Sequence, residues 1–221
     1  MATSNSRDFD LDVAELIEEA YERCGLELRT GYDARTARRS LNLMFADWAN
    51  RGLNLWTVTQ ETKAVTSGTA TYTLDSEFVD LLEVVLRNSS NVDFTLTQMS
   101  RGEYLRIPNK DNSGQPSQYF FDRQTTPTIT LWSTPDTSYT LVYYYVRRIQ
   151  DADTLTNTTD APFRFLPCMA AGLAYYISMK KAPDRIQILK AVYEEEFQRA
   201  ASEDANSTPL KLTPNISYLR Y

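Results

Sequence analysis

Apolar residues recur at three- and four-residue steps in two segments near the start of the chain. The first segment, about 10–24, ends at Gly25, which adopts the left-handed backbone of a helix C-cap without steric cost. The second begins near Asp33, a candidate N-cap, and ends at Gly52. We therefore predict a hairpin of two amphipathic helices, whose apolar faces must pack against another part of the protein. On the second helix this face consists of Ala37, Leu41, Met44, Phe45 and Trp48.

The hydrophobic period changes from 3.6 to 2 after the hairpin, which predicts β-strands. Residues 57–74 alternate around Ser67-Gly68, a hairpin signal, and NSSN at 88–91 predicts a second turn. A short helix is expected within 100–107. Three more strands are predicted in SQYFFDR, TITLWS and SYTLVYYYVRRI. Strands this short and numerous indicate an antiparallel sandwich or open barrel.

Helical sequence returns in the last third of the chain. Asp160 is a candidate N-cap for the first of these helices. Its central run, 168–179, is apolar on nearly every side, which predicts a buried helix. Pro183 opens a last amphipathic helix, with Tyr193 and Phe197 on its inner face.

The final residues form a tail of a different kind. Prolines at 209 and 214 exclude a helix, yet apolar side chains alternate with polar ones as in a strand. The tail either folds onto its own domain or docks into a neighbouring subunit or partner by strand addition. The docking residues would be Leu210, Leu212, Ile216, Tyr218, Leu219 and Tyr221.

These patterns together predict an α+β fold in which both chain ends build one helical bundle around an inserted antiparallel β domain. We expect four parts: an N-terminal helical hairpin (1–55), the β domain (56–155), a C-terminal helix pair that completes the bundle (156–205) and an extended docking tail (206–221).

Composition narrows the possible functions. The formal net charge of −6 argues against a protein that grips nucleic acid through clustered cations. No apolar run is long enough for a membrane span, and the first residues lack the apolar core of a signal peptide. We therefore expect synthesis and folding in a reducing cytoplasm. Cys24 and Cys168 are expected to be small buried hydrophobes rather than a disulfide.

Catalytic chemistry is scarce in this sequence. The chain has no histidine and no phosphate-binding glycine motif, so we predict no enzyme activity, no metal and no cofactor. Paired carboxylates are the remaining enzymatic possibility, and we expect them to be solvated surface instead. The candidates are Asp75, Glu77, Asp80 and Asp122.

The aromatic and basic residues suggest packing and binding contacts rather than catalysis. Aromatic runs at 119–121 and 143–145 could stack on bases or sugars, but core and interface packing is the favoured interpretation. A basic cluster that includes Arg51 surrounds the second helix, where it could contact phosphates or acidic residues of a neighbouring subunit. The predicted inter-subunit contacts are Arg35, Arg38, Arg39, Trp48, Tyr193 and Phe197.

Three stretches carry a family resemblance: LIEEAYERCGLE at 16–27, ARRSLNLMFADWANRGLNLW at 37–56 and AAGLAYYISMKKAPDRIQILKAVYEEEFQRA at 170–200. In these stretches the chain resembles the head-to-tail adaptor proteins of short-tailed bacteriophages, a group that includes tail tubular protein A and the packaged-DNA stabilisation proteins. The β insert resembles the tail tubular type in pattern only.

The resemblance implies a structural virion protein that forms a ring of about twelve copies between the portal and the tail. Its implied partners are the portal protein, the tail nozzle and fibre proteins, and double-stranded DNA that passes without specific binding. In relatives the C-terminal segment reaches the portal, and here that segment is 208–221. We expect the free protein to be monomeric or weakly associated until the ring forms on the portal.

Two other functions remain open at this level. One is a carbohydrate-binding β module of a phage tail, with weak hydrolysis by a carboxylate pair; it requires exposed aromatic side chains beside two carboxylates on one β face. The other is an oligomeric DNA-binding regulator, which the acidic charge disfavours.

Overall fold

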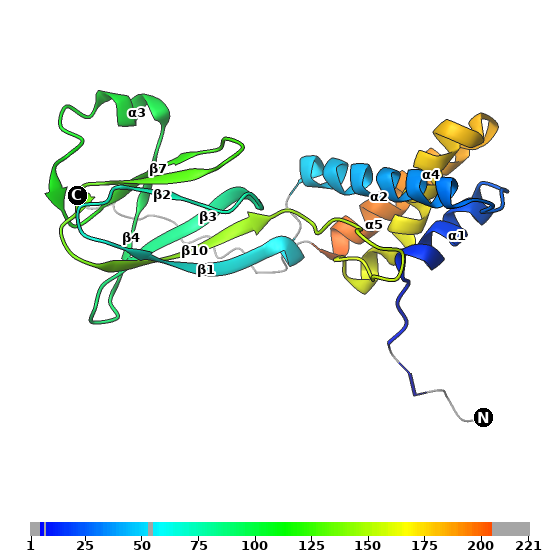
Figure 1. Ribbon diagram of the computed structural model, residues 1–221, viewed down its shortest axis with the longest axis horizontal. Coiled ribbons are helices and arrows are strands. Elements are labelled where there is room, and N and C mark those ends of the chain that lie inside the picture. Colours follow the sequence, from blue (N-terminus) through cyan, green and yellow to red (C-terminus); the bar gives the residue numbers. More distant parts are fainter. Residues whose placement is uncertain (1–4, 7, 53–54, 205–221) are drawn as a thin grey trace, which may run out of the picture.

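The computed structural model describes residues 5–6, 8–52 and 55–204, and it joins a helical domain to a β domain along one long axis (Figure 1). The helical domain takes its helices from both ends of the chain, and the β domain is inserted between them, so the predicted α+β fold is confirmed. The helical domain contains α1 (Val13–Arg23), α2 (Gly31–Arg51), α4 (Leu166–Lys181) and α5 (Ile186–Glu203), with single 3-10 turns at Leu55–Thr57, Phe163–Phe165 and Pro183–Arg185.

Side-chain caps set where the first helices begin. Asp12 and Glu15 form a capping box at the start of α1, in which the Glu15 amide donates to Asp12 Oδ1 at 2.8 Å. The helix ends before Gly25, which has φ +67° as predicted. Helix α2 begins before the predicted Asp33, because Thr30 Oγ1 accepts the Asp33 amide at 3.2 Å and is the true N-cap. Asp33 instead lies in the first turn.

Helix α4 is the centre of the helical domain and packs against α1, α2 and α5. Its middle is buried as predicted, and Gly172 lies between Met44 of α2 and Tyr193 of α5. A Cβ atom at this position would lie 2.4 Å from Met44 Sδ and 2.7 Å from Tyr193 Cε2. The absence of a side chain at Gly172 therefore lets α2 and α5 approach α4 together.

The β domain is a sandwich of two four-stranded sheets, with strand orders β1-β10-β3-β4 and β2-β8-β7-β5. Side chains from both sheets share one core, which includes Val65, Leu86, Ile129, Leu131 and Leu141. The strands are β1 (Val58–Val65), β2 (Thr71–Thr73), β3 (Phe78–Arg87), β4 (Asp93–Thr95), β5 (Thr97–Met99), β6 (Ser113–Gly114), β7 (Gln118–Asp122), β8 (Thr128–Trp132), β9 (Thr134–Pro135) and β10 (Tyr139–Arg147).

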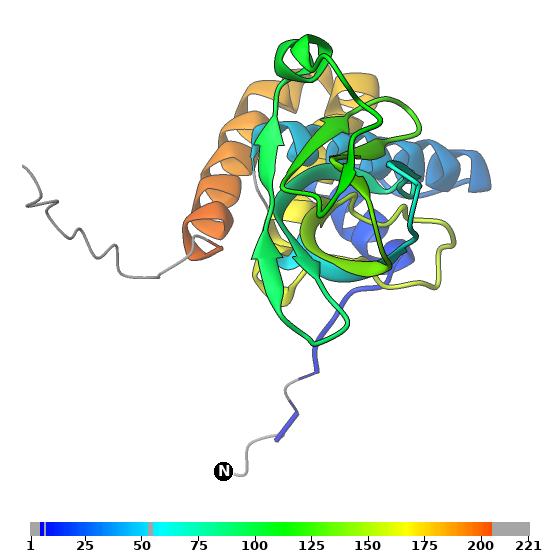
Figure 2. The same ribbon diagram turned by 90° about the vertical axis from the view of Figure 1, so that its left-hand side faces the viewer.

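The turn at 88–91 joins β3 and β4 as an antiparallel hairpin, as predicted. Asn88 organises this turn, since its Oδ1 accepts the amides of Ser90 and Val92 at 2.9 Å each. The predicted short helix is also present as α3 (Arg101–Arg106), which Ser100 caps. Viewed along the molecule from the β domain, α3 lies at one edge of the sandwich (Figure 2).

The hairpin predicted around Ser67-Gly68 is wrong. Strand β1 pairs along all its residues with β10, whereas β2 pairs with β8 in the other sheet, so this turn carries the chain between sheets. The long antiparallel partner offered by β10 outweighs the local pairing that the turn residues suggested. The sheets also depart from the antiparallel expectation at two short pairs, β5 with β7 and β6 with β9, which are parallel.

The crowding at Gly172 gives a first prediction. Gly172→Ala should lower the free energy of unfolding by about 1–3 kcal/mol, because the new methyl group overlaps Met44 and Tyr193. Urea denaturation measures this change. Gly102→Ala is the matched control in α3, where the nearest atom is 4.0 Å from the added Cβ. Helix propensity alone would stabilise both variants by about 1 kcal/mol, so a stabilised Gly172→Ala would contradict the packing argument.

Candidate assembly surfaces and the domain junction

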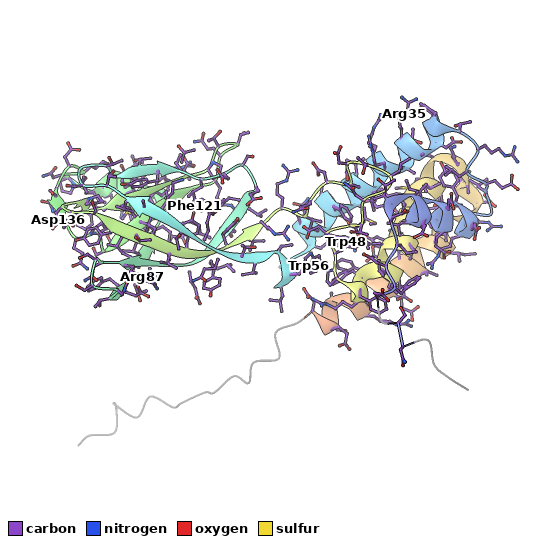
Figure 3. The ribbon with its side chains drawn as sticks, turned by 60° about the horizontal axis from the view of Figure 1, so that its bottom comes forward. Arg35, Trp48, Trp56, Arg87, Phe121 and Asp136 are labelled. Atoms are coloured by element: carbon purple, nitrogen blue, oxygen red, sulfur yellow. The ribbon has the colours of Figure 1, made fainter. Side chains whose placement is uncertain are left out.

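The chain crosses between the two domains twice, and the first crossing is anchored by Trp56. Its ring packs against Phe165 at a centroid distance of 4.5 Å, and its indole N–H donates to the Asp160 carbonyl at 3.0 Å. Figure 3 shows Trp56 at the junction, with Trp48 inside the helical domain. The entry to β1 is therefore bound to the segment that opens α4.

The second crossing is held by the Asp160 carboxylate. Arg147, the last residue of β10, donates from both terminal guanidinium nitrogens, with Nη2 at 2.9 Å from Oδ1, and the Gln150 amide donates at 3.1 Å. The hydrogen bond with Asp160 raises the pKa of the Arg147 guanidinium above its ordinary value. The expected role of Asp160 as a helix N-cap is wrong, because its side chain faces the end of β10.

Asp204, directly after α5, adds a third tie across the junction. Its buried carboxylate accepts the Leu55 amide at 2.8 Å and a hydrogen bond from the Arg164 guanidinium. It therefore joins the start of the β insert, the turn before α4 and the end of α5. Since Leu55 lies in the turn that leads into β1, Asp204 and Asp160 anchor the two crossings to the helical domain.

Arg51 connects the end of α2 to the middle of α5 on the helical domain's surface. Its guanidinium donates to both carboxylate oxygens of Glu194 at 2.8 and 3.0 Å and to Asp47 at 2.7 Å. It also lies over the rings of Tyr193 and Phe197, at 5.0 and 4.7 Å from their centroids. Burial opposes the charged form, but the Glu194 and Asp47 hydrogen bonds outweigh it and raise the pKa of Arg51.

The aromatic residues expected to contact a neighbouring subunit lie inside the chain's own core. Trp48 and Tyr193 have no exposed surface, and the Trp48 indole N–H donates to the Tyr193 hydroxyl at 2.8 Å. Neither side chain is available to another subunit, so we correct the expectation for both. Phe197 remains half-buried beneath the Arg51 guanidinium.

The three arginines of α2 have different environments. Arg38 is half-buried and donates to the Asp153 carbonyl, while Arg35 and Arg39 are exposed. Beside Arg38, Asn42 Oδ1 accepts the Ala152 amide at 2.8 Å. Only Arg35 and Arg39 of this group therefore present free guanidinium surface.

The segment after β10 has a structural role that sequence patterns did not reveal. It crosses α2 through the Arg38 and Asn42 contacts and then reaches the start of α1. There the Val13 amide donates to the Asn157 carbonyl at 3.0 Å and the Ala14 amide donates to the Leu155 carbonyl at 2.9 Å. These contacts satisfy amides that a helix N-terminus leaves without internal partners.

The aromatic strands of the β domain fill its core, as favoured. Tyr143 and Tyr145 are buried, with Tyr144 pointing to the exposed face between them. Tyr119 and Phe121 are buried on β7. The run at 143–145 therefore does not supply the exposed aromatic face that the carbohydrate-binding alternative requires.

Three of the four candidate catalytic carboxylates, Glu77, Asp80 and Asp122, contact other side chains. Glu77 accepts the Tyr145 hydroxyl at 2.6 Å, and burial followed by this hydrogen bond raises the pKa of Tyr145. Asp80 and Asp122 each have an arginine neighbour, Arg123 at 3.4 Å and Arg101 at 3.7 Å respectively. These pairings are typical of structural surface carboxylates.

Residues 5–6, 8–52 and 55–204 contain no group of three or more acidic or cysteine side chains placed to bind a metal ion. Within the same part of the chain, no helix has the length and apolarity that a bilayer crossing demands. The predicted docking tail, 206–221, lies outside the described residues.

Both cysteines are buried, as predicted. Cys24 Sγ donates to the Ala174 carbonyl at 3.2 Å, across the contact between α1 and α4. Burial raises the pKa of Cys24, and it raises the pKa of Cys168 to about 12. Both thiols are therefore held in the protonated, unreactive form at neutral pH.

The chain matches a known protein family along most of its length. A family model described as SU10 adaptor protein matches residues 11–214, which include both helical segments and the whole β insert. A search of curated proteins found no match.

The junction gives a second prediction. Asp160→Ala should lower the free energy of unfolding by about 1–3 kcal/mol, because it leaves the partly buried Arg147 guanidinium without its carboxylate. Limited proteolysis should also cut faster between the domains. Asp93→Ala is the matched control, since it removes a similar two-point contact with Arg87 on an exposed hairpin. Equal losses in the two variants would contradict a special role for the junction.

The thiols give a third prediction. In the native protein Ellman's reagent at pH 8 should release almost no product within minutes, since the Cys168 thiolate is a fraction of roughly 10⁻⁴ at that pH. Denaturation in guanidinium chloride should expose both cysteines. Rapid reaction of either thiol in the native state would show that α4 is not packed as described.

Proposed function

The chain belongs to the SU10 adaptor protein family, and from this membership we propose that it is a structural virion protein joining the portal to the tail of a bacteriophage. The observation that carries the proposal is the extent of the family match, which runs through both helical segments and the β insert. The fold supports it, because both ends of the chain build one body from which a separate sandwich projects (Figure 1).

The proposed assembly is a ring of about twelve copies, mounted beneath the portal of a short-tailed phage. The helical domain faces the portal, and the β domain projects toward the tail nozzle and fibres. The two-domain shape suits this division, since the domains lie at opposite ends of the molecule (Figure 1). The ties at Asp160 and Asp204 suit it as well, because they hold the two ends in one orientation.

The proposed handling of DNA is passive. Each copy contributes a net charge of −6, so a ring of about twelve carries a strongly acidic field. An acidic channel lets DNA pass at ejection without sticking, and retention of the packaged genome then depends on steric closure by the ring and its partners. The protein is made in the host cytoplasm and becomes part of the virion neck.

The proposed portal anchor is the C-terminal tail, 206–221. Its apolar residues alternate with polar ones, the pattern of a strand that pairs with an open sheet edge. Before assembly the free protein is monomeric or weakly associated, because like-charged copies repel one another.

Co-sedimentation with the cognate portal is the fourth prediction and tests the adaptor role. The full chain should bind in stoichiometric amounts, and a chain ending at Ala205 should not. Replacing Leu212 and Ile216 with serine should weaken binding by about tenfold or more, because it removes apolar contacts of the docked strand. The matched control is Thr213→Ser with Asn215→Ser, which changes neighbouring polar positions.

The outcomes separate the two parts of the proposal. Binding that survives truncation at Ala205 would contradict the tail anchor and leave the adaptor role in place. Failure of the full-length chain to bind the portal would contradict the adaptor role itself.

A further inference from the structure

An open groove runs along the outer side of α1 and the start of α4, with a volume of about 500 Å³. On its α4 side Pro167 is exposed, while Leu166 and Ala170 are buried at the base. We call it the α1 groove. Its apolar lining consists of Phe9, Leu11, Leu166, Pro167 and Ala170.

Carboxylates of α1 form the rim of this groove. Glu15 belongs to the capping box, and Glu19 is paired with Arg23 at 2.7 Å. Glu18 and Glu22 are exposed and take part in no ion pair within the described chain. They lie four residues apart on one helix, a spacing at which like charges repel. The rim therefore presents two uncompensated negative charges beside apolar surface.

A surface of opposite sign lies on α2. Tyr32, Arg35, Arg39 and Leu43 follow one another at three- and four-residue steps, so they form one exposed stripe, which we call the α2 stripe. Tyr32 is 66% exposed and Leu43 is 55% exposed. Figure 3 shows Arg35 at the edge of the helical domain opposite α5.

The positive charge of the α2 stripe is also uncompensated. Arg35 and Arg39 form no ion pair with any residue in the described ranges. Lys180 stands close by and donates to Ser40 Oγ at 2.6 Å. Burial, followed by the charge of Arg39, lowers the pKa of Lys180.

The two surfaces match in charge, spacing and apolar content. Two guanidiniums four residues apart meet two carboxylates four residues apart, a separation of about 6 Å along each helix. In an antiparallel arrangement Arg35 meets Glu22 and Arg39 meets Glu18. Leu43 then reaches the apolar end of the groove near Leu11. Each ion pair would be flanked by apolar contact, which excludes water and strengthens it.

One chain cannot make this contact with itself. Helices α1 and α2 are both fixed against α4, with the groove and the stripe on their outer sides. The matching surfaces therefore meet only between two copies. We propose that the α1 groove of one copy binds the α2 stripe of the next. This contact is heterologous, and such contacts generate closed rings when the rotation between copies closes. The inference rests on the proposed ring and identifies the surfaces that form it.

Disulfide cross-linking is the fifth prediction and tests the contact directly. Glu18→Cys and Arg39→Cys are made in separate full-length chains, mixed at high concentration and oxidised. Since the native thiols are buried, only the introduced cysteines should react. The mixture should form covalent dimers at about ten times the rate of either variant alone. The control mixture pairs Glu18→Cys with Arg199→Cys on α5, and it should match the single variants.

Charge reversal on the portal gives the complementary readout. E18R/E22R and R35E/R39E should each weaken ring formation by about tenfold or more, and the chain with all four changes should recover it. The matched control E195R/R199E reverses an existing pair on α5 and should assemble normally. Circular dichroism melting of each variant establishes that all are folded.

Several results would overturn the inference. One is cross-linking that is no faster in the mixture than in the single variants. Another is loss of assembly in E18R/E22R without recovery in the fourfold variant, which would indicate a different protein in the groove. If the native chain binds the portal but ring formation is unaffected by these substitutions, the proposed contact is wrong and the proposed function stands. Selective cross-linking in a chain that does not bind the portal would support the contact between copies and contradict the portal role.

Discussion

A helix that is apolar on every side must be covered on every side, and the architecture of this protein follows from that constraint. The run at 168–179 cannot be buried by α5 alone, so the N-terminal hairpin, far away in sequence, has to complete the cover. Both chain ends are thereby brought together, and the intervening segment is forced outward as a separate domain. The helices pack tightly at Gly172, since Met44 and Tyr193 occupy the space that a side chain would take there.

The same constraint explains the junction. Once the chain leaves α2 for the sandwich and returns to α4, both crossings pass the same end of the helical domain. Asp160 and Asp204 bind main-chain amides and arginines there. The Trp56 ring adds an apolar contact by packing against Phe165. Carboxylates suit this place because they accept several hydrogen bonds at once from segments that meet at different angles.

Features that depend on local sequence pattern were predicted correctly, whereas features that depend on contacts between distant segments of the chain were missed. Helix periods, the stop at Gly25 and the turn at 88–91 are local, and they were correct. The partner of β1, the target of Asp160 and the path of 150–158 depend on distant segments, and no local pattern specifies them. Trp48 and Tyr193 show a related limit, because an apolar stripe looks the same whether its own chain or another subunit covers it.

The α1 groove leaves apolar surface beside the start of α4, and this surface bears on the proposed assembly. A purely apolar gap at the α1 groove would drive association of free chains at any concentration. The proposed contact instead depends on charged side chains. The like charges of each helix repel one another, and they are attracted only by the opposite charges of the other helix. Such a contact is weak in dilute solution. In the proposed assembly, neighbouring chains held side by side on a portal would have a high effective concentration, so the same weak contact would be sufficient. Under this proposal, charged rather than apolar complementarity is what would let the ring form on the portal and not in free solution.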